Sequence, residues 1–232
     1  MQLLWRRPTV GTLALSRYLR RRRVTLPKQF VLSSPHPGEG RLFSFNPSDY
    51  GQFTAAMIDL QRLCDLGPGE PNTSVHAALK QMTVESIFGD RPITNRDMAR
   101  CCVSAIWLWH DFLDESHEIS QTIGSSTGSY WHGIMHRREP DYPNGKYWFN
   151  RVGEHPIFED LFHAANQVAR EHDATGPDLD FLVSQREWDP IRFIDLCEHA
   201  NSTGNESELI CKKVAQSEWT SLFDFCFRSA TS

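Results

Sequence analysis

The sequence contains no apolar run of about 18 residues, the length that a bilayer-spanning helix requires. Its longest apolar stretch, from Val103 to Leu113, is interrupted by Ser104, His110 and Asp111. The six cysteines form no CxxC pair, which disfavours a zinc ribbon or a disulfide framework. Most cysteines lie in segments with helical periodicity. We therefore expect buried free thiols, a reducing and cytoplasmic location, and no membrane partner.

Acidic residues are missing from the first 38 positions, which carry eight Lys and Arg residues. Because the whole chain has a net charge of −5, residues 39–232 carry −13. An acidic body repels phosphate groups, so we expect no nucleic-acid partner. Residues 1–41 have three interpretations: an Arg-rich targeting peptide, a disordered basic arm for an anionic partner, or a start codon assigned too early. We favour a disordered extension or an early start codon, with one folded domain at 42–232.

Strand-like alternation and internal repeats are also absent, whereas helical periodicity recurs along the body. Asn46-Pro47 is typical of a helix N-cap and first position, and it predicts a helix that extends to about Leu66. Further helices are predicted at about 73–88, 94–118, 129–138, 156–170, 189–200 and 207–228. Hydrophobic residues make up 40% of the chain, which is enough for a core. The prediction is an all-α, single-domain bundle of six to eight helices.

The predicted helix at 94–118 carries ionisable residues on an apolar stripe. At 100° per residue, His110, Asp114 and His117 are spaced i, i+4, i+7 and share one face with Ile106. An unpaired buried charge is costly, so groups that face inward need each other, a metal ion or a substrate. The alternative is an apolar stripe that ends at His110, with Asp114 and His117 at the solvent-exposed edge of the helix.

A second group of polar residues lies in the segment YWHGIMHRRE, residues 130–139. His132 and His136 form an HxxxH pair, whose imidazoles project to one side of a helix at a spacing that suits one metal ion. Glu139 lies three residues further on the same side. The pair lacks the inserted glutamate of the HExxH metalloproteases. The alternative is an ordinary amphipathic helix with exposed histidines.

A loop of about ten residues separates these two segments, short enough for an antiparallel helix pair that would bring both groups together. The candidate metal ligands are His110, His132 and His136. The candidate catalytic groups are Asp114, His117 and Glu139. Such a set can hold a divalent ion such as Zn, Fe or Mn, which would act as a Lewis acid and activate water. Without a metal, the same groups can act as acid and base.

Aromatic residues interleaved with cations follow at residues 141–151, in a segment that Pro143 and Gly145 interrupt. This composition suits the wall of a pocket for a small polar or anionic molecule, with the cations binding a carboxylate or phosphate. The alternative is an ordinary loop whose aromatic residues pack against the core. The candidate substrate contacts are Arg137, Lys146, Tyr147, Trp148 and His155.

The segment YWHGIMHRREPDYPNGKYWFNRVGEHP, residues 130–156, resembles the signature of an uncharacterised protein family, a WHGxxHRRExDxxNxKYWFxxxGxHP-like string. The likeness is direct over this segment and looser over the rest of the body. It implies no reaction and no cofactor, because none is established for that family. It indicates only that this segment is central to the family.

Three classes of function remain open. The first is an enzyme with a His/carboxylate site that acts on a small polar or anionic substrate, with hydrolysis as the default reaction because it needs only an activated water. The second is a non-catalytic helical module that holds a small anionic ligand in the same place. The third is a structural or interaction protein whose histidines are ordinary core and surface residues.

Overall fold

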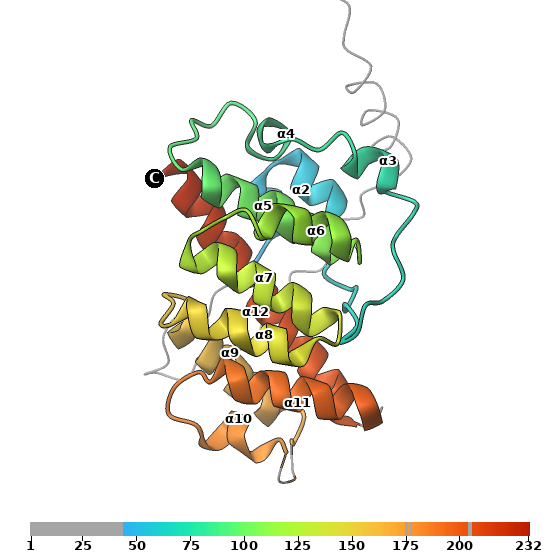
Figure 1. Cartoon of the computed structure of the whole chain (residues 1–232), viewed down its shortest axis with the longest axis vertical. Helices are drawn as coiled ribbons and strands as arrows, with labels where there is room; N and C mark the ends of the chain where they lie inside the picture. Colours follow the sequence, from blue (N-terminus) through green and yellow to red (C-terminus); the bar gives the residue numbers. More distant parts are fainter. Residues whose placement is uncertain (1–43, 175, 177, 204–205) are drawn as a thin grey trace, which may run out of the picture.

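The computed structural model describes residues 44–174, 176, 178–203 and 206–232. Within these residues every regular element is helical: one 3-10 helix and eleven α-helices, with no strand. The predicted all-α bundle is confirmed (Figure 1). There are more helices than the six to eight expected, because several predicted helices are broken into shorter ones. The predicted basic extension at 1–41 lies outside the described residues.

The first two predicted helices, at 46–66 and 73–88, are each replaced by two short ones. The elements are η1 (Pro47–Tyr50), α2 (Gln52–Met57), α3 (His76–Leu79) and α4 (Val84–Phe88). The Asn46 side chain caps η1 as expected, accepting a hydrogen bond of 3.2 Å from the Ser48 amide. After α2 the backbone becomes extended at Ile58, and it is irregular until α3.

The predicted helix at 94–118 is also two helices, α5 (Arg96–Trp109) and α6 (Leu113–Ser120). The break falls at Asp111, whose φ of 62° is left-handed. Aspartate tolerates this conformation better than most residues. The Asp111 carboxylate forms ion pairs with Arg62 and with Arg138, the latter at 2.6 Å. Gly69 passes so close that a Cβ there would lie 2.7 Å from the Asp111 Cγ. Tertiary contacts therefore stabilise a break that local sequence does not signal.

Two consecutive helices, α7 (Ser126–Arg138) and α8 (Tyr142–Val152), pack closely together. The second lies between the helices predicted at 129–138 and 156–170, where no helix was expected. The Asp141 side chain caps α8 and Pro143 lies in its first turn, where a missing amide costs no hydrogen bond. Gly133 permits the close packing, because a Cβ there would lie 2.8 Å from the Phe149 ring.

The last four helices are α9 (Phe158–Glu171), α10 (Asp180–Ser184), α11 (Pro190–Thr203) and α12 (Glu206–Thr231). Three of them follow the predicted pattern closely, and the short α10 is an addition to it. The long helix α12, red in Figure 1, packs against α5, α9 and α11. Its residues belong to two core clusters. Ile210 and Val214 lie in the cluster with α9 and α11, and Leu222 and Phe223 lie in the cluster with α5 and α7.

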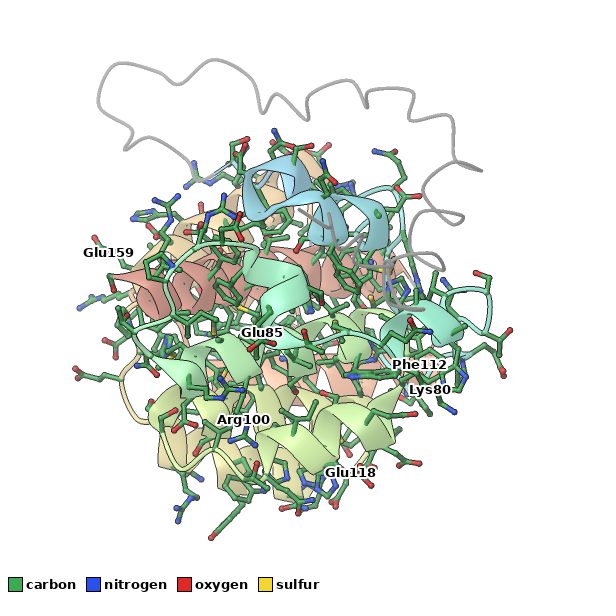
Figure 2. The ribbon with its side chains drawn as sticks, turned by 90° about the horizontal axis from the view of Figure 1, so that it is seen from above. Lys80, Glu85, Arg100, Phe112, Glu118 and Glu159 are labelled. Atoms are coloured by element: carbon green, nitrogen blue, oxygen red, sulfur yellow. The ribbon has the colours of Figure 1, made fainter. Side chains whose placement is uncertain are left out.

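The core cluster that contains Leu222 and Phe223 also includes residues of the short early helices and of α5 to α7, and Figure 2 shows these elements from above. Phe112, labelled there, lies beside α3 and stacks on the His76 ring at a centroid distance of 4.8 Å. All six cysteines are free thiols and five are buried, as the sequence predicts. None of the described helices combines the length and the apolar character needed to cross a bilayer.

The two ion pairs of Asp111 generate a first prediction. Substitution Asp111→Ala leaves Arg62 and Arg138 without their shared carboxylate, and we expect the free energy of unfolding to fall by about 3 kcal/mol in urea denaturation. The exposed Asp114 is the matched control, and Asp114→Ala should change stability by no more than about 0.5 kcal/mol. Equal effects of the two substitutions would contradict a stabilising role for the Asp111 ion pairs.

Candidate metal centre

Three histidines converge from two neighbouring helices. His117 belongs to α6, and His132 and His136 belong to α7, which lies beside α6 in Figure 1. One nitrogen of each ring can be chosen so that all three lie within 4.8 Å of one another. The ring centroids are 4.7 Å apart for the pair on α7, and 4.8 and 5.2 Å from His117. The HxxxH spacing thus brings both imidazoles to one side of α7, and α6 adds the third.

His132 lies at the buried end of this histidine cluster. It is 3% exposed, and neither ring nitrogen has a hydrogen-bond partner among the described residues. Its ring stacks on Trp148 of α8 at 4.0 Å, with an angle of 22° between the planes. Burial, together with the two neighbouring histidines, lowers the pKa of His132 to about 3. The ring is therefore neutral, and one of its nitrogens carries a free lone pair.

His136 differs from His132 because polar groups surround it. Its Nδ1 lies 3.1 Å from Glu139 Oε2 and 4.0 Å from Asp141 Oδ2. Burial lowers the pKa of His136, although Glu139 opposes that shift. When Nδ1–H donates to Glu139, the lone pair is on Nε2. Such a carboxylate–histidine contact orients metal-ligating rings in many proteins.

Asn144 of α8 completes the surroundings of His136. Its amide Nδ2 lies 3.1 Å from Nε2 and 3.3 Å from Nδ1 of that ring. An ion at Nε2 would require the amide to turn, because a donor at 3.1 Å competes with a metal for the same lone pair. His117 is only half-buried, so solvent reaches the cluster from the α6 side. The arrangement therefore has a closed side at His132 and an open side at His117.

Two predicted members of the site lie elsewhere. His110 ends α5, where its Nδ1 is 3.3 Å from Asn72 Nδ2 and 3.5 Å from Arg62 Nη1. Asp114 is exposed in the first turn of α6 and does not belong to the histidine cluster. The prediction that His110 shares a face with His117 is wrong, because it assumed one continuous helix through Asp111. Asp114 lies in the same helix as His117, but only His117 joins the histidine cluster.

The predicted substrate contacts separate into two groups. Arg137 and His155 are buried away from the cluster. The Arg137 guanidinium pairs with Glu218 and lies 4.8 Å from the Phe193 ring, whereas the His155 Nε2 is 3.2 Å from Thr127 Oγ1. Both side chains are therefore engaged away from the histidine cluster, and their role as substrate contacts stays a prediction.

The other three candidates belong to α8. Trp148 packs directly on His132, and Tyr147, 54% exposed, lies 5.5 Å from Trp148. The Arg151 guanidinium lies 5.3 Å from the Trp148 ring, so this part of α8 presents aromatic faces and a cation next to the cluster. Lys146 instead forms an ion pair with Asp195 of α11.

Asn144 was not among the predicted site residues, because no helix was expected between residues 138 and 156. A signal was present: Asp141 before Tyr142-Pro143 is an N-cap followed by a proline in the first turn. A helix that starts there places Asn144 and Trp148 four residues apart on one face. Both residues contact histidines of α7.

No protein-family model matches the chain, and comparisons with curated proteins and with solved structures find no match. The geometry of the site is therefore the basis for any proposal of function.

The buried His155 generates a prediction about pH. Burial lowers its pKa from 6.5 to about 4, so between these values the unfolded chain binds a proton that the folded protein does not. Stability therefore falls as the pH drops from 6.5 towards 4. We expect His155→Phe to flatten this dependence in thermal melts, whereas His163→Phe, at an exposed histidine, should leave it unchanged. An identical slope in wild type and His155→Phe would contradict the assignment.

Proposed function

We propose that the protein binds a divalent transition-metal ion through His117, His132 and His136, and that it is a hydrolase for a small polar or anionic substrate. The observation that carries the proposal is the buried His132, whose neutral ring has no described hydrogen-bond partner although two further imidazoles adjoin it. Buried polar atoms rarely lack a partner, and a metal ion would supply one.

The donor set favours zinc over manganese. Imidazole nitrogens suit Zn, Fe and Ni, whereas Mn prefers carboxylate and carbonyl oxygens. Three histidines with a fourth position open form a known type of catalytic zinc site. Zinc would supply a Lewis acid and lower the pKa of a bound water enough to make it a nucleophile at neutral pH. The solvent-accessible side at His117 is where that water and a substrate would enter.

Each neighbouring residue has a distinct part in this proposal. Glu139 is a positioning residue, since it fixes the tautomer and orientation of His136 through the Nδ1 contact. Trp148 holds the His132 ring by stacking. Tyr147 and Arg151 offer an aromatic face and a cation to a polar or anionic substrate.

Metal binding without turnover is the second candidate, and one observation favours it. The carboxylate closest to the cluster, Glu139, is engaged with His136 and is not available as a base.

The free thiols and the acidic body support a reducing, cytoplasmic location and a partner other than nucleic acid.

Metal content tests the ligand set. Wild-type protein loaded with zinc and desalted should retain about one ion per chain, and His132→Ala or His117→Ala should weaken zinc binding at least about tenfold by loss of one ligand. His163→Ala, at an exposed histidine outside the cluster, is the control and should retain the ion. Retention of zinc by both cluster variants would overturn the site.

The positioning role of Glu139 is tested by Glu139→Gln. We expect zinc affinity to fall by about tenfold to a hundredfold, because the His136 ring loses its carboxylate partner. The exposed Glu118 of α6 is the control, and Glu118→Gln should bind zinc as wild type does. Equal affinities of the two variants would remove Glu139 from the site.

Turnover separates the enzyme from the binder. Hydrolysis of an activated ester such as p-nitrophenyl acetate should increase on zinc loading of the wild type and should be lost in His132→Ala. Binding of zinc with no zinc-dependent hydrolysis of esters, amides or phosphate esters would favour the non-catalytic alternative.

A further inference from the structure

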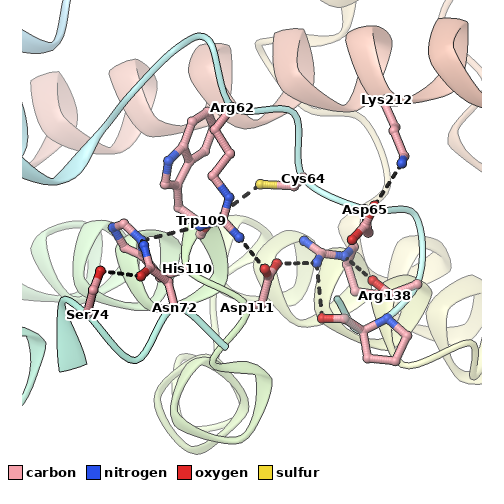
Figure 3. Close-up of polar contacts among 12 residues, drawn as sticks. Arg62, Cys64, Asp65, Asn72, Ser74, Trp109, His110, Asp111, Arg138 and Lys212 are labelled. Atoms are coloured by element: carbon pink, nitrogen blue, oxygen red, sulfur yellow. Dashed lines mark hydrogen bonds and ion pairs between the residues drawn. The ribbon is translucent and has the colours of Figure 1, made fainter. Parts of the chain in front are cut away.

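A cavity of about 30 Å³ lies between α5, α7, α12 and the segment before α3. On the scale where one water needs roughly 10–15 Å³, it holds about two water-sized groups. Figure 3 shows how Cys64, Asp65, Trp109, Arg138 and Lys212 come together there from these elements. None of the residues that line it belongs to the histidine cluster.

Two N–H donors in residues that line this cavity have no acceptor among the described residues. They are Nε1 of Trp109 and Nη1 of Arg137, whose residues are 1% and 2% exposed. The neighbouring Trp219 differs, because its Nε1 donates to the Ala105 carbonyl at 3.1 Å. Since indole and guanidinium only donate, the partner that both lack is a hydrogen-bond acceptor.

The three arginines at and beside the inner end of the cavity exceed their carboxylates by one, and at the outer end Lys212 balances this excess because it pairs with both Asp65 and Glu208. Arg62, Arg137 and Arg138 face two carboxylates, Asp111 and Glu218. The Arg137 pair is complete, whereas Arg62 and Arg138 share the single Asp111 carboxylate. The demand that these groups leave is therefore for an acceptor to the two unpartnered N–H groups, and a charged acceptor would make the stronger hydrogen bonds.

The outer end of the cavity is formed by the ion pair between Lys212 and Asp65, at 2.7 Å. Both residues reach solvent, with side-chain exposures of 18% and 56%. These two flexible side chains can move apart at the surface without disturbing the core, so a group can enter between them. The remainder of a larger ligand would then project into solvent.

We propose that this cavity binds the carboxylate group of a small molecule, with its oxygens accepting from Trp109 Nε1 and Arg137 Nη1. The carboxylate is planar and offers two acceptors, and its three non-hydrogen atoms match the volume. A phosphate, with five such atoms, is too large. The proposal is independent of the metal centre, because the two sites share no residue.

The test titrates metal-free full-length protein with potassium formate, with potassium chloride at the same ionic strength as reference. The readout is the indole N–H resonance of Trp109 in two-dimensional ¹H–¹⁵N NMR, identified as the signal that Trp109→Phe removes. Formate should shift this resonance saturably, acetate should do so less strongly, and inorganic phosphate should do so no more than chloride. A shift by all anions alike, or none, overturns the proposal in favour of a cavity that holds water only.

Affinities measured by calorimetry on two variants complete the test. Trp109→Phe removes one donor and Ala215→Leu fills the cavity from α12, and each should weaken formate binding about tenfold or more. The control is Trp188→Phe, at a buried tryptophan outside the cavity. Its formate affinity should stay within about twofold of wild type, because Trp188 does not line the cavity. Wild-type affinity in folded Trp109→Phe and Ala215→Leu, checked by circular dichroism, contradicts the assignment.

Discussion

The ion-paired Asp111 determines how the two helices of the candidate site meet. Its left-handed backbone ends α5 and starts α6 in a new direction, and Arg62 and Arg138 stabilise that conformation from distant parts of the chain. Without this break, α6 would continue the axis of α5 and His117 would follow the face of His110. With it, His117 approaches α7 and meets His132 and His136.

The same interaction connects the two proposed sites. Arg138 ends α7, pairs with Asp111 and donates to the Gly67 carbonyl at 2.6 Å, so it fixes the segment that borders the carboxylate cavity. His132 and His136 lie earlier on the same helix and contact α6 and α8 instead. A single helix therefore contributes histidines to one site and guanidinium groups to the other.

Local patterns predicted some of this arrangement and could not predict the rest. The HxxxH spacing places His132 and His136 together because both lie within one helix, where periodicity decides orientation. The Asp111 break carries no Gly or Pro, and its cause is a pair of arginines remote in sequence, so no local pattern signals it. Helix α8 was missed because Pro143 and Gly145 are ordinarily breakers, whereas here one lies in the first turn and the other faces α7 across a close contact.

The sequence pattern also could not predict which polar residues are buried. Arg137 and His155 belong to the polar, aromatic segment that suggested a pocket wall, yet both are core residues whose polar atoms contact Glu218 and Thr127. The isolation of His132 is likewise visible only in three dimensions, because it depends on Trp148 covering one face of its ring. The proposed function therefore depends on contacts between helices.

X-ray absorption spectroscopy of the zinc-loaded protein tests the central claim most directly, because it reports the atoms bound to the ion. Three imidazole nitrogens at about 2.0–2.1 Å, with one oxygen donor from water, are the result that the proposed site predicts. A sulfur donor at about 2.3 Å, or a shell of oxygens without imidazole scattering, would contradict it.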